Sequence, residues 1–394
     1  MRSGKAMRPL SEYLKPPALA LFLLGATQGC AAGKDLTPDS GSDSDSDSGI
    51  AGARALSIIT GGVLDLVALD PETGTETWRA AAGTTYNALH AADGVVYALE
   101  QDSDFTTIAY DLATGSELFR AVGDDEDLTP GPLVTDGVLI TGWDRNTVAG
   151  LALTAPQTPA WTFEAAASPV GQAAIVAGLY VFGDGEGHVY ALDPSDGAVA
   201  WEADLGGAVI GGIVATEDSA FTSVVPSTVV RLDGDTGAVS WSADVGPGNL
   251  WGLVDVGGER VYASTDDGVE NLMALDRGTG AVAWRVDHPT YGPDGGVRLT
   301  ALGLLVPTYG HVTMFDADDG TELWTAVGGS AALTLPMVWD DGAYFSGAGT
   351  FTKLDLETGA VDWTLDDRDL FSWFAAPSIL LDDGRTLNAT DTRE

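Results

Sequence analysis

The chain has 394 residues, of which 58 are acidic and 18 are Lys or Arg, so its formal net charge is −40 at pH 7. So acidic a chain has no basic patch that could neutralise phosphates, which excludes nucleic acid as a partner. After Cys30 the only lysines are Lys34 and Lys353. An acidic, lysine-poor surface is typical of proteins that work in high salt, and equally of exported proteins kept soluble by charge.

Residues 1–29 have the pattern of a signal peptide. A short apolar run covers residues 18–26, and it is preceded by four basic residues, Arg2, Lys5, Arg8 and Lys15. A run this short, behind basic residues, indicates an exported chain and not a membrane span. The run is followed by Cys30, the only cysteine, which predicts a lipoprotein-type signal with Cys30 lipidated. An ordinary cleaved signal with an incidental cysteine is the alternative, and in either case no structural disulfide can form within the chain.

Residues 30–54 form an acidic tract rich in Ser and Asp, without side chains that could build a core. We predict a flexible tether there, extended by its own charges. Asp43, Asp45 and Asp47 have part of the spacing of a calcium loop. Ser48 stands where the loop needs glycine and Arg54 where it needs glutamate, so calcium binding is not predicted.

One motif recurs from residue 66 to residue 363, seven times clearly and once in degraded form. Clear copies such as VALDPETGTETW, MALDRGTGAVAW and TKLDLETGAVDW place an aspartate four residues before a glycine and eight before an aromatic residue. Successive aromatic residues of the motif are 39 to 43 residues apart. A regular period of about 40 residues, built from strand-like segments, is typical of β-propeller blades.

Each copy contains the chemistry of a chain reversal between two strands. The aspartate side chain can accept backbone N–H bonds from the next residues, and the glycine adopts positive φ without steric cost. A second reversal lies between copies, for example at Asp93-Gly94, Asp136-Gly137 and Asp341-Gly342. Asp-Gly between strand-like runs is a strong hairpin signal, so each repeat should contain four strands.

We therefore predict an all-β fold, an eight-bladed β-propeller of four-stranded antiparallel blades over residues 55–394. The chain enters at LSIIT without an innermost run and ends with FAAPSILLDDG, so N- and C-terminal strands should share one blade, with the C-terminal run as its inner strand. Such sharing leaves few open sheet edges. LSIIT and RTLNATD both have the character of the second strand of that blade, so one of them must lie outside the pattern.

One aromatic residue per repeat is large enough to fill the gap between neighbouring sheets. We expect these residues to dock blade against blade: Trp78, Phe119, Trp161, Trp201, Trp241, Trp284, Trp324 and Trp363. Trp161 belongs to the degraded copy. The aspartates of the motif are assigned to turns and not to catalysis.

The motif Ala-x-Asp-x-x-Thr-Gly-x-x-x-Trp, nearly whole in ALDPETGTETW and ALDRGTGAVAW, resembles the tryptophan-docking motif of the pyrroloquinoline-quinone-like (PQQ-like) β-propeller repeat superfamily. The resemblance covers nearly everything from Leu56 onward. It implies the fold but no single function, because the superfamily includes quinoprotein dehydrogenases and non-catalytic scaffolds. In layout the chain is most similar to propeller lipoproteins of the outer-membrane barrel-assembly machinery, which implies a tethered platform with envelope proteins as partners.

For an enzyme of this superfamily, the resemblance implies PQQ and calcium as cofactors. The chain lacks the vicinal cysteine pair that stacks on the quinone in such enzymes, and their calcium ligands and catalytic aspartate have no match here. Its four histidines fall in different repeats without metal-ligand spacing: His90, His188, His288 and His311. We therefore expect no catalytic residue, no metal site and no cofactor. A small PQQ-dependent alcohol or sugar dehydrogenase is the alternative.

If the ring binds a partner, we expect the end where outer strands return to inner strands to bind it, because those connections converge around the central channel. The sequence places six candidate contact residues there: Tyr86, Asn87, Asn249, Trp251, Tyr291 and Trp373. Trp251 and Trp373 are candidates for interface anchors, for a platform that stacks on a sugar or quinone, or for a plug of the channel mouth.

The leading hypothesis is a lipid-anchored, non-catalytic scaffold for protein–protein interaction at the cell envelope. A surface glycan-binding module is a further alternative to the dehydrogenase. Ala31 stands where many Gram-negative lipoproteins that stay on the inner membrane have aspartate, so we expect the outer membrane, with the domain facing the periplasm or the outside.

Overall fold

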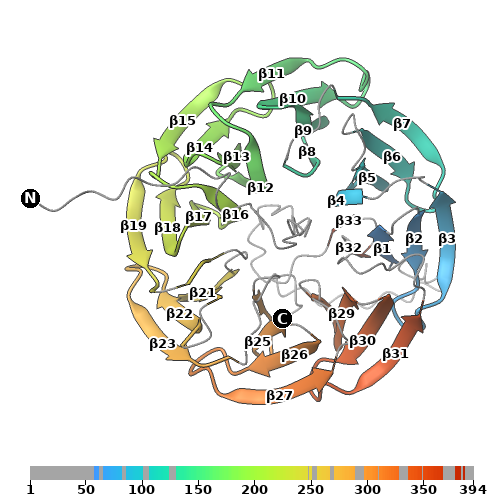
Figure 1. The fold of residues 1–394 in the computed structure, drawn as a ribbon. Helices are drawn as coiled ribbons and strands as arrows, with labels where there is room; N and C mark the ends of the chain where they lie inside the picture. The colour runs from blue at the N-terminus through green and yellow to red at the C-terminus, as the bar shows by residue number, and fades with distance from the viewer. Residues whose placement is uncertain are drawn as a thin grey trace, which may run out of the picture.

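The structure is a computed structural model that describes residues 57–61, 65–81, 86–100, 106–123, 130–246, 248–250, 255–266, 270–288, 297–308, 310–327, 336–347, 349–366, 378–382 and 385–386. Every regular element in these ranges is a β-strand, and the sheets stand radially around a common centre (Figure 1). No helix among them is long and apolar enough to cross a membrane. The predicted signal peptide, Cys30 and the tether lie outside the described residues.

Seven sheets have four antiparallel strands each, ordered from the centre of the ring to its rim. The β4–β7 blade contains β4 (Tyr86–Ala92), β5 (Val95–Glu100), β6 (Thr107–Asp111) and β7 (Glu117–Ala121). The β8–β11 blade contains β8 (Leu133–Thr135), β9 (Val138–Asp144), β10 (Thr147–Ala152) and β11 (Trp161–Glu164). The β12–β15 blade contains β12 (Pro169–Val176), β13 (Leu179–Asp184), β14 (His188–Leu192) and β15 (Val199–Asp204).

The other four blades repeat this order around the ring (Figure 1). The β16–β19 blade contains β16 (Val209–Ala215), β17 (Ser219–Val224), β18 (Thr228–Asp233) and β19 (Val239–Asp244). The β20–β23 blade contains β20 (Asp255–Gly257), β21 (Arg260–Ser264), β22 (Leu272–Asp276) and β23 (Val282–Val286). The β24–β27 blade contains β24 (Arg298–Leu299), β25 (Leu304–Thr308), β26 (His311–Phe315) and β27 (Glu322–Val327). The β28–β31 blade contains β28 (Met337–Trp339), β29 (Gly342–Gly347), β30 (Thr350–Asp355) and β31 (Val361–Asp366).

The prediction of eight four-stranded blades is wrong, because only seven sheets have four strands and the strands from the two ends of the chain form a sheet of five. This closing sheet has the order β3-β2-β1-β32-β33. Its strands are β1 (Ser57–Gly61), β2 (Asp65–Leu69), β3 (Glu76–Ala81), β32 (Ser378–Asp382) and β33 (Arg385–Thr386). Both terminal segments join the sheet, since β1 pairs with β32 and β33 continues past β32 as the extra strand.

The sharing of one sheet by the two ends of the chain is confirmed. Ser57 is paired with Leu381 and Thr60 with Ser378 in an antiparallel ladder. The ring is therefore closed by backbone hydrogen bonds between segments at opposite ends of the sequence. Closure of this kind pairs the edge of β1 that the N-terminal segment would otherwise leave open.

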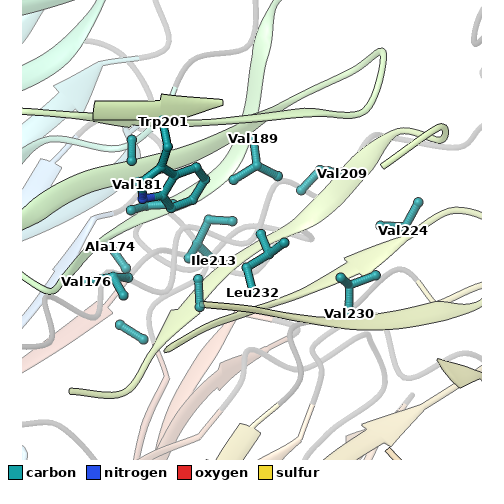
Figure 2. Packing of buried hydrophobic residues seen from close by; sticks show 13 residues of the cluster. Ala174, Val176, Val181, Val189, Trp201, Val209, Ile213, Val224, Val230 and Leu232 are labelled. Carbon is teal, nitrogen blue, oxygen red and sulfur yellow. The ribbon is translucent and has the colours of Figure 1, made fainter. Parts of the chain in front are cut away.

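The hydrophobic core lies between neighbouring sheets. Figure 2 shows one cluster, in which Trp201 and Val181 of the β12–β15 blade pack with Ile213 and Leu232 of the β16–β19 blade. Val181 and Leu232 are fully buried. Burying a side chain of this size stabilises a fold by about 1.5–3 kcal/mol, and repetition of such clusters around the ring replaces a single central core.

The tight reversals have the backbone that Asp-Gly favours. Asp93 and Gly94 both have positive φ, at 51° and 77°, and Asp136 and Gly137 have φ of 47° and 78°. Positive φ at two consecutive residues is the geometry of a type I′ hairpin turn. In the β28–β29 reversal the residue with positive φ is Asp340 and not the predicted Asp341.

Candidate functional site

The tryptophans of the motif connect each sheet to the next one. Seven indole Nε1 groups donate a hydrogen bond to a backbone carbonyl of the following sheet, in each case the residue after the motif aspartate. The pairs are Trp78 to Leu112 (2.7 Å), Trp161 to Pro194 (3.0 Å), Trp201 to Gly234 (2.8 Å), Trp241 to Arg277 (2.9 Å), Trp284 to Ala317 (3.1 Å), Trp324 to Leu356 (3.2 Å) and Trp363 to Pro71 (3.1 Å).

The glycine of each turn makes room for the incoming indole. Gly115 has a φ of 68°, and a Cβ added to it would lie 2.5 Å from Cε3 of Trp78. Non-bonded contacts between two carbon atoms are not that short, so this position needs glycine for space as well as for φ. The tryptophan of one repeat and the glycine of the next therefore belong to one joint.

The motif aspartates shape these turns. Oδ1 of Asp276 accepts hydrogen bonds from the hydroxyl of Thr279 (2.7 Å) and from its backbone N–H (2.8 Å). These two bonds, in that order, lower the pKa of Asp276. The carboxylate is thus engaged by its own turn, which matches the turn role predicted from the sequence.

One joint lacks this arrangement on both sides. The Phe119 side chain of β7 has no N–H to donate, and the degraded repeat that follows it has neither the aspartate nor the glycine of the motif. The β4–β7 and β8–β11 blades instead meet through a buried bond between the hydroxyls of Thr107 and Thr141, at 3.0 Å. Phe119 packs there beside Tyr97 and Leu139.

The candidate binding surface is the end of the ring where outer strands return to inner strands, called the return face below. It contains the outer-to-inner connections and the turns between second and third strands. In the β12–β15 blade these segments are in contact, since Gly185 N donates to Ser168 O (3.1 Å) and Ala166 N to the Tyr190 hydroxyl (3.1 Å).

Tyr86 and Asn87 belong to the inner strand β4. The Tyr86 side chain is 4% exposed, and its hydroxyl lies 2.9 Å from that of Tyr110. Burial, then the bond to Tyr110, raises the pKa of the Tyr86 phenol far above its ordinary value, so it is neutral at physiological pH. Tyr86 therefore packs in the core between its blade and the closing sheet. The Asn87 side chain lies outside the described residues.

Asn249 lies on the return face and binds Asp266, which follows β21. Its backbone N–H donates to Oδ1 of Asp266 (2.6 Å) and its side-chain amide to Oδ2 (2.9 Å). The Asp266 N–H returns a bond to the Asn249 carbonyl at 3.1 Å. These bonds join two return-face segments. The other predicted contacts, Trp251, Tyr291 and Trp373, lie outside the described residues.

A polar cluster that the sequence did not predict lies on the same face. Asp184 is fully buried, and its Oδ1 accepts bonds from the backbone N–H groups of Glu186, Gly187 and His188 at 2.8–2.9 Å. Nδ1 of His188 donates to Oδ2 at 2.9 Å. The carboxylate thereby fixes both the turn and the orientation of the imidazole.

This geometry leaves Nε2 of His188 as the ring nitrogen available to a partner, on a side chain that is 23% exposed. Burial lowers the pKa of His188, but the bond to Asp184 and the charge of that carboxylate outweigh it, so the pKa lies above its ordinary value. In the neutral ring, which donates Nδ1–H to Asp184, Nε2 can accept a hydrogen bond from a partner, and in the protonated ring it can donate one. The four-residue spacing of Asp184 and His188 was the only signal in the sequence, and spacing alone does not reveal burial.

Two other histidines are buried. Burial lowers the pKa of His90 and of His288 to about 4, so both rings are neutral at pH 7. Among the described residues neither nitrogen of His288 has a hydrogen-bond partner, and its ring meets Phe315 edge-on at 5.3 Å. No three His, Cys, Asp or Glu side chains of the described ranges are grouped so that they could hold a metal ion.

A family model described as outer membrane protein assembly factor BamB matches residues 26–207, 185–303 and 270–388. A quinoprotein ethanol dehydrogenase of Pseudomonas aeruginosa is 35% identical over 94 residues, which is 23% of this chain and only 15% of the length of that enzyme.

Three solved structures have a similar fold. BamB of Moraxella catarrhalis superposes with a TM-score of 0.60 at 17% identity, covering 78% of this chain and 91% of that one. Sqt1 of Saccharomyces cerevisiae gives 0.62 at 14% identity, with coverages of 77% and 96%. Apo AztD of Citrobacter koseri gives 0.61 at 12% identity, with coverages of 83% and 98%. At these identities the likeness concerns the fold alone.

Proposed function

Because this chain belongs to the PQQ-repeat β-propeller family of outer membrane protein assembly factor BamB, we propose that it is a non-catalytic scaffold that binds other proteins at the cell envelope. The observation that carries the proposal is the family match, which extends from residue 26 to residue 388. Outer-membrane assembly components are the partners that the family name suggests.

The construction of the return face supports a binding role. Asn249 is held by Asp266, and His188 is oriented by the buried Asp184, so polar groups at this end are fixed before a partner arrives. A preorganised surface loses less conformational entropy on binding. The motif aspartates, by contrast, are occupied in turns at the opposite end of the blades.

Site-specific photo-crosslinking in cells tests the proposal. A photoreactive residue at Glu186, which is exposed on the return face, should give adducts with envelope proteins. The matched control is Asp196, an exposed residue in the motif turn of the same blade. Adducts from position 186 and none from 196 would support a scaffold that uses the return face. Absence of adducts at both positions, or equal adducts from both, would contradict it.

We further propose that Cys30 carries the lipid that holds the protein at the outer membrane. The basic residues and apolar run before Cys30 support this assignment. Cys30→Ser should abolish incorporation of a labelled fatty acid and move the protein from the membrane fraction to the soluble fraction. Incorporation that persists in the variant would contradict the assignment.

One observation favours a second function, a small PQQ-dependent alcohol dehydrogenase, namely the 94-residue match to the ethanol dehydrogenase. The test adds PQQ and calcium to the purified protein, with ethanol and an electron-accepting dye. Quinone absorbance that co-elutes with the protein, together with dye reduction, would favour the enzyme over the scaffold. If neither quinone absorbance nor dye reduction is observed, the dehydrogenase function is excluded. The predicted glycan platform rests on Trp251 and Trp373, outside the described residues.

A further inference from the structure

Lys353 occupies an unusual position for a charged residue. It lies on β30, between Tyr344 of β29 and Trp363 of β31 in the cross-strand ladder, on the side of the blade that faces the closing sheet. The residue is only 4% exposed. In the same register most other repeats have a small or apolar residue, such as Ala68, Ala191 or Met314.

The blade is shaped around this lysine. A Cβ added to Gly342 would lie 2.7 Å from Cε of Lys353, so the glycine leaves space for the aliphatic stem. The ammonium lies 5.9 Å from the centre of the Tyr344 ring, within reach of a cation–π attraction. The charged end of Lys353 is therefore placed by packing.

Three carboxylates surround the ammonium. Nζ lies 3.3 Å from Asp362, 3.4 Å from Asp341 and 3.6 Å from Glu72. Asp362 and Asp341 belong to the β28–β31 blade, on β31 and at the β28–β29 reversal. Glu72 comes from the closing sheet, in the turn between β2 and β3.

Glu72 is adjacent to Pro71, whose carbonyl accepts the Nε1 hydrogen of Trp363 at 3.1 Å. One turn of the closing sheet is thus held by the neighbouring blade through an indole and an ammonium. This joint carries the ends of the chain, since β1 and β32 meet in the same sheet.

We propose that Lys353 is a fixed counter-ion that fastens the closing sheet to the β28–β31 blade, so that this one positive charge, together with the Trp363–Pro71 hydrogen bond, holds the last joint of the ring. A buried ion pair can often be replaced by apolar residues without loss of stability. Lys353 is not part of a simple ion pair of that kind, because one cation faces three carboxylates in a chain with a net charge of −40. Removing the cation leaves those carboxylates to repel one another across the joint.

Arg231 occupies the same register in the β16–β19 blade and provides a comparison. Its guanidinium donates to the Ser219 hydroxyl at 2.8 Å and to the Arg277 carbonyl of the next blade at 3.4 Å. Asp218, from its own blade, is the carboxylate nearby, at 3.9 Å. Arg231 therefore contacts the next sheet through a neutral carbonyl, and its replacement leaves no comparable group of like charges.

Hydrogen exchange measured by mass spectrometry on the full chain tests the proposal. Lys353→Met should speed amide exchange in β1 and β32 by at least about tenfold relative to the β12–β15 blade, because the local opening equilibrium of these strands should rise by that factor. Adding Asp362→Asn to that variant should restore part of the protection, as should high salt, which screens the repulsion. Arg231→Met should leave β1 and β32 unchanged.

Two surface variants keep the test valid if Lys353→Met does not fold. Glu72→Gln removes the carboxylate that crosses the joint, and Asp341→Asn removes one within the blade. Glu72→Gln should speed exchange in β1 and β32 by about two- to fivefold, as expected for a partly exposed ion pair. Asp341→Asn should not. Equal effects of the two, or unchanged or slower exchange in Lys353→Met, would overturn the proposal.

Discussion

The indole of Trp363 donates its Nε1 hydrogen to the carbonyl of Pro71, 292 residues earlier in the chain, at 3.1 Å. The same donor–acceptor relationship joins consecutive repeats elsewhere, for example Trp284 and Ala317 at 3.1 Å. The joint between the last blade and the closing sheet thus uses the contact that the repeats use internally, although its donor and its acceptor come from opposite ends of the series of repeats.

Trp363→Phe should lower the free energy of unfolding by about 2 kcal/mol, because the hydrogen bond is lost and part of the space beside Phe351 is left unfilled. Trp284→Phe loses a bond of the same length in mid-ring and is the matched control. Chemical denaturation measures both. We expect hydrogen exchange in β1 and β32 to rise for Trp363→Phe alone, and an equal rise for both variants would contradict a specific role in closure.

Phe119→Trp should not stabilise the protein, although it restores the residue found in the other repeats. The turn between β10 and β11 lacks the aspartate and the glycine of the turns that accept the indole N–H elsewhere, and the extra ring must enter a joint already occupied by Tyr97 and Leu139. Overpacking of this kind costs about 1–3 kcal/mol. A rise in melting temperature of the variant would show that the joint can accept a tryptophan without the turn.

Gly115→Ala should destabilise the protein by more than Gly94→Ala. Both glycines have positive φ, at 68° and 77°, so both substitutions cost about 1 kcal/mol for the backbone. Only at Gly115 would the new methyl collide with an indole, 2.5 Å away, whereas nothing lies within 4 Å at Gly94. The difference in unfolding free energy measures the collision, and equal losses would contradict docking over the glycine.

Lowering the pH should reduce the free energy of unfolding, because the buried His90 and His288 rings are protonated less readily in the folded protein than in the unfolded chain. Their folded-state pKa is about 4 and the ordinary value is 6.5, so the unfolded chain binds more protons between these values. The stability contributed is present above pH 6.5 and is lost as the pH falls towards 4, by up to about 3 kcal/mol for each ring. The pKa of His188 is raised, so its contribution has the opposite sign and is lost as the pH rises.

His288→Phe isolates one of these terms, since the Phe ring keeps the edge contact with Phe315 and cannot be protonated. Urea denaturation at pH 7 and pH 4.5 should show a smaller acid-induced loss of unfolding free energy in the variant than in the unaltered protein. His188→Gln, measured in parallel, should show a larger loss. Identical pH dependence in all three proteins would contradict the assignment to these rings.

Much of the fold could be predicted because its determinants are local and repeated. The spacing of Asp, Gly and Trp indicates a reversal and a docking residue in each copy, and the structure contains both, as in Asp276, Gly280 and Trp284. The fifth strand of the closing sheet could not be predicted, because β33 contains only two residues and its place depends on pairing with β32.

The candidate site was harder to predict, because burial is not a local property of the sequence. Tyr86 was expected on the return face and instead lies in the core between its blade and the closing sheet, with its hydroxyl against that of Tyr110. The pairing of Asp184 with His188 was missed, since an aspartate beside glycines normally indicates an exposed turn. Glu72 and Lys353 are brought together by ring closure, which no pattern within one repeat encodes.

The unusual joint at Phe119 has a consequence for how such a ring can diverge. A donor in one repeat and its acceptor turn in the next are both missing there, while Trp161 of the degraded repeat still finds its carbonyl in Pro194. The loss is thus confined to the joint between the β4–β7 and β8–β11 blades. The β8–β11 blade, which has the altered turn, still forms the usual joint with the β12–β15 blade. The donor and the acceptor of each joint lie in two neighbouring repeats, so their sequences must change together. Replacing one repeat by another should therefore be tolerated only if both of its joints, with the preceding and with the following repeat, can still form.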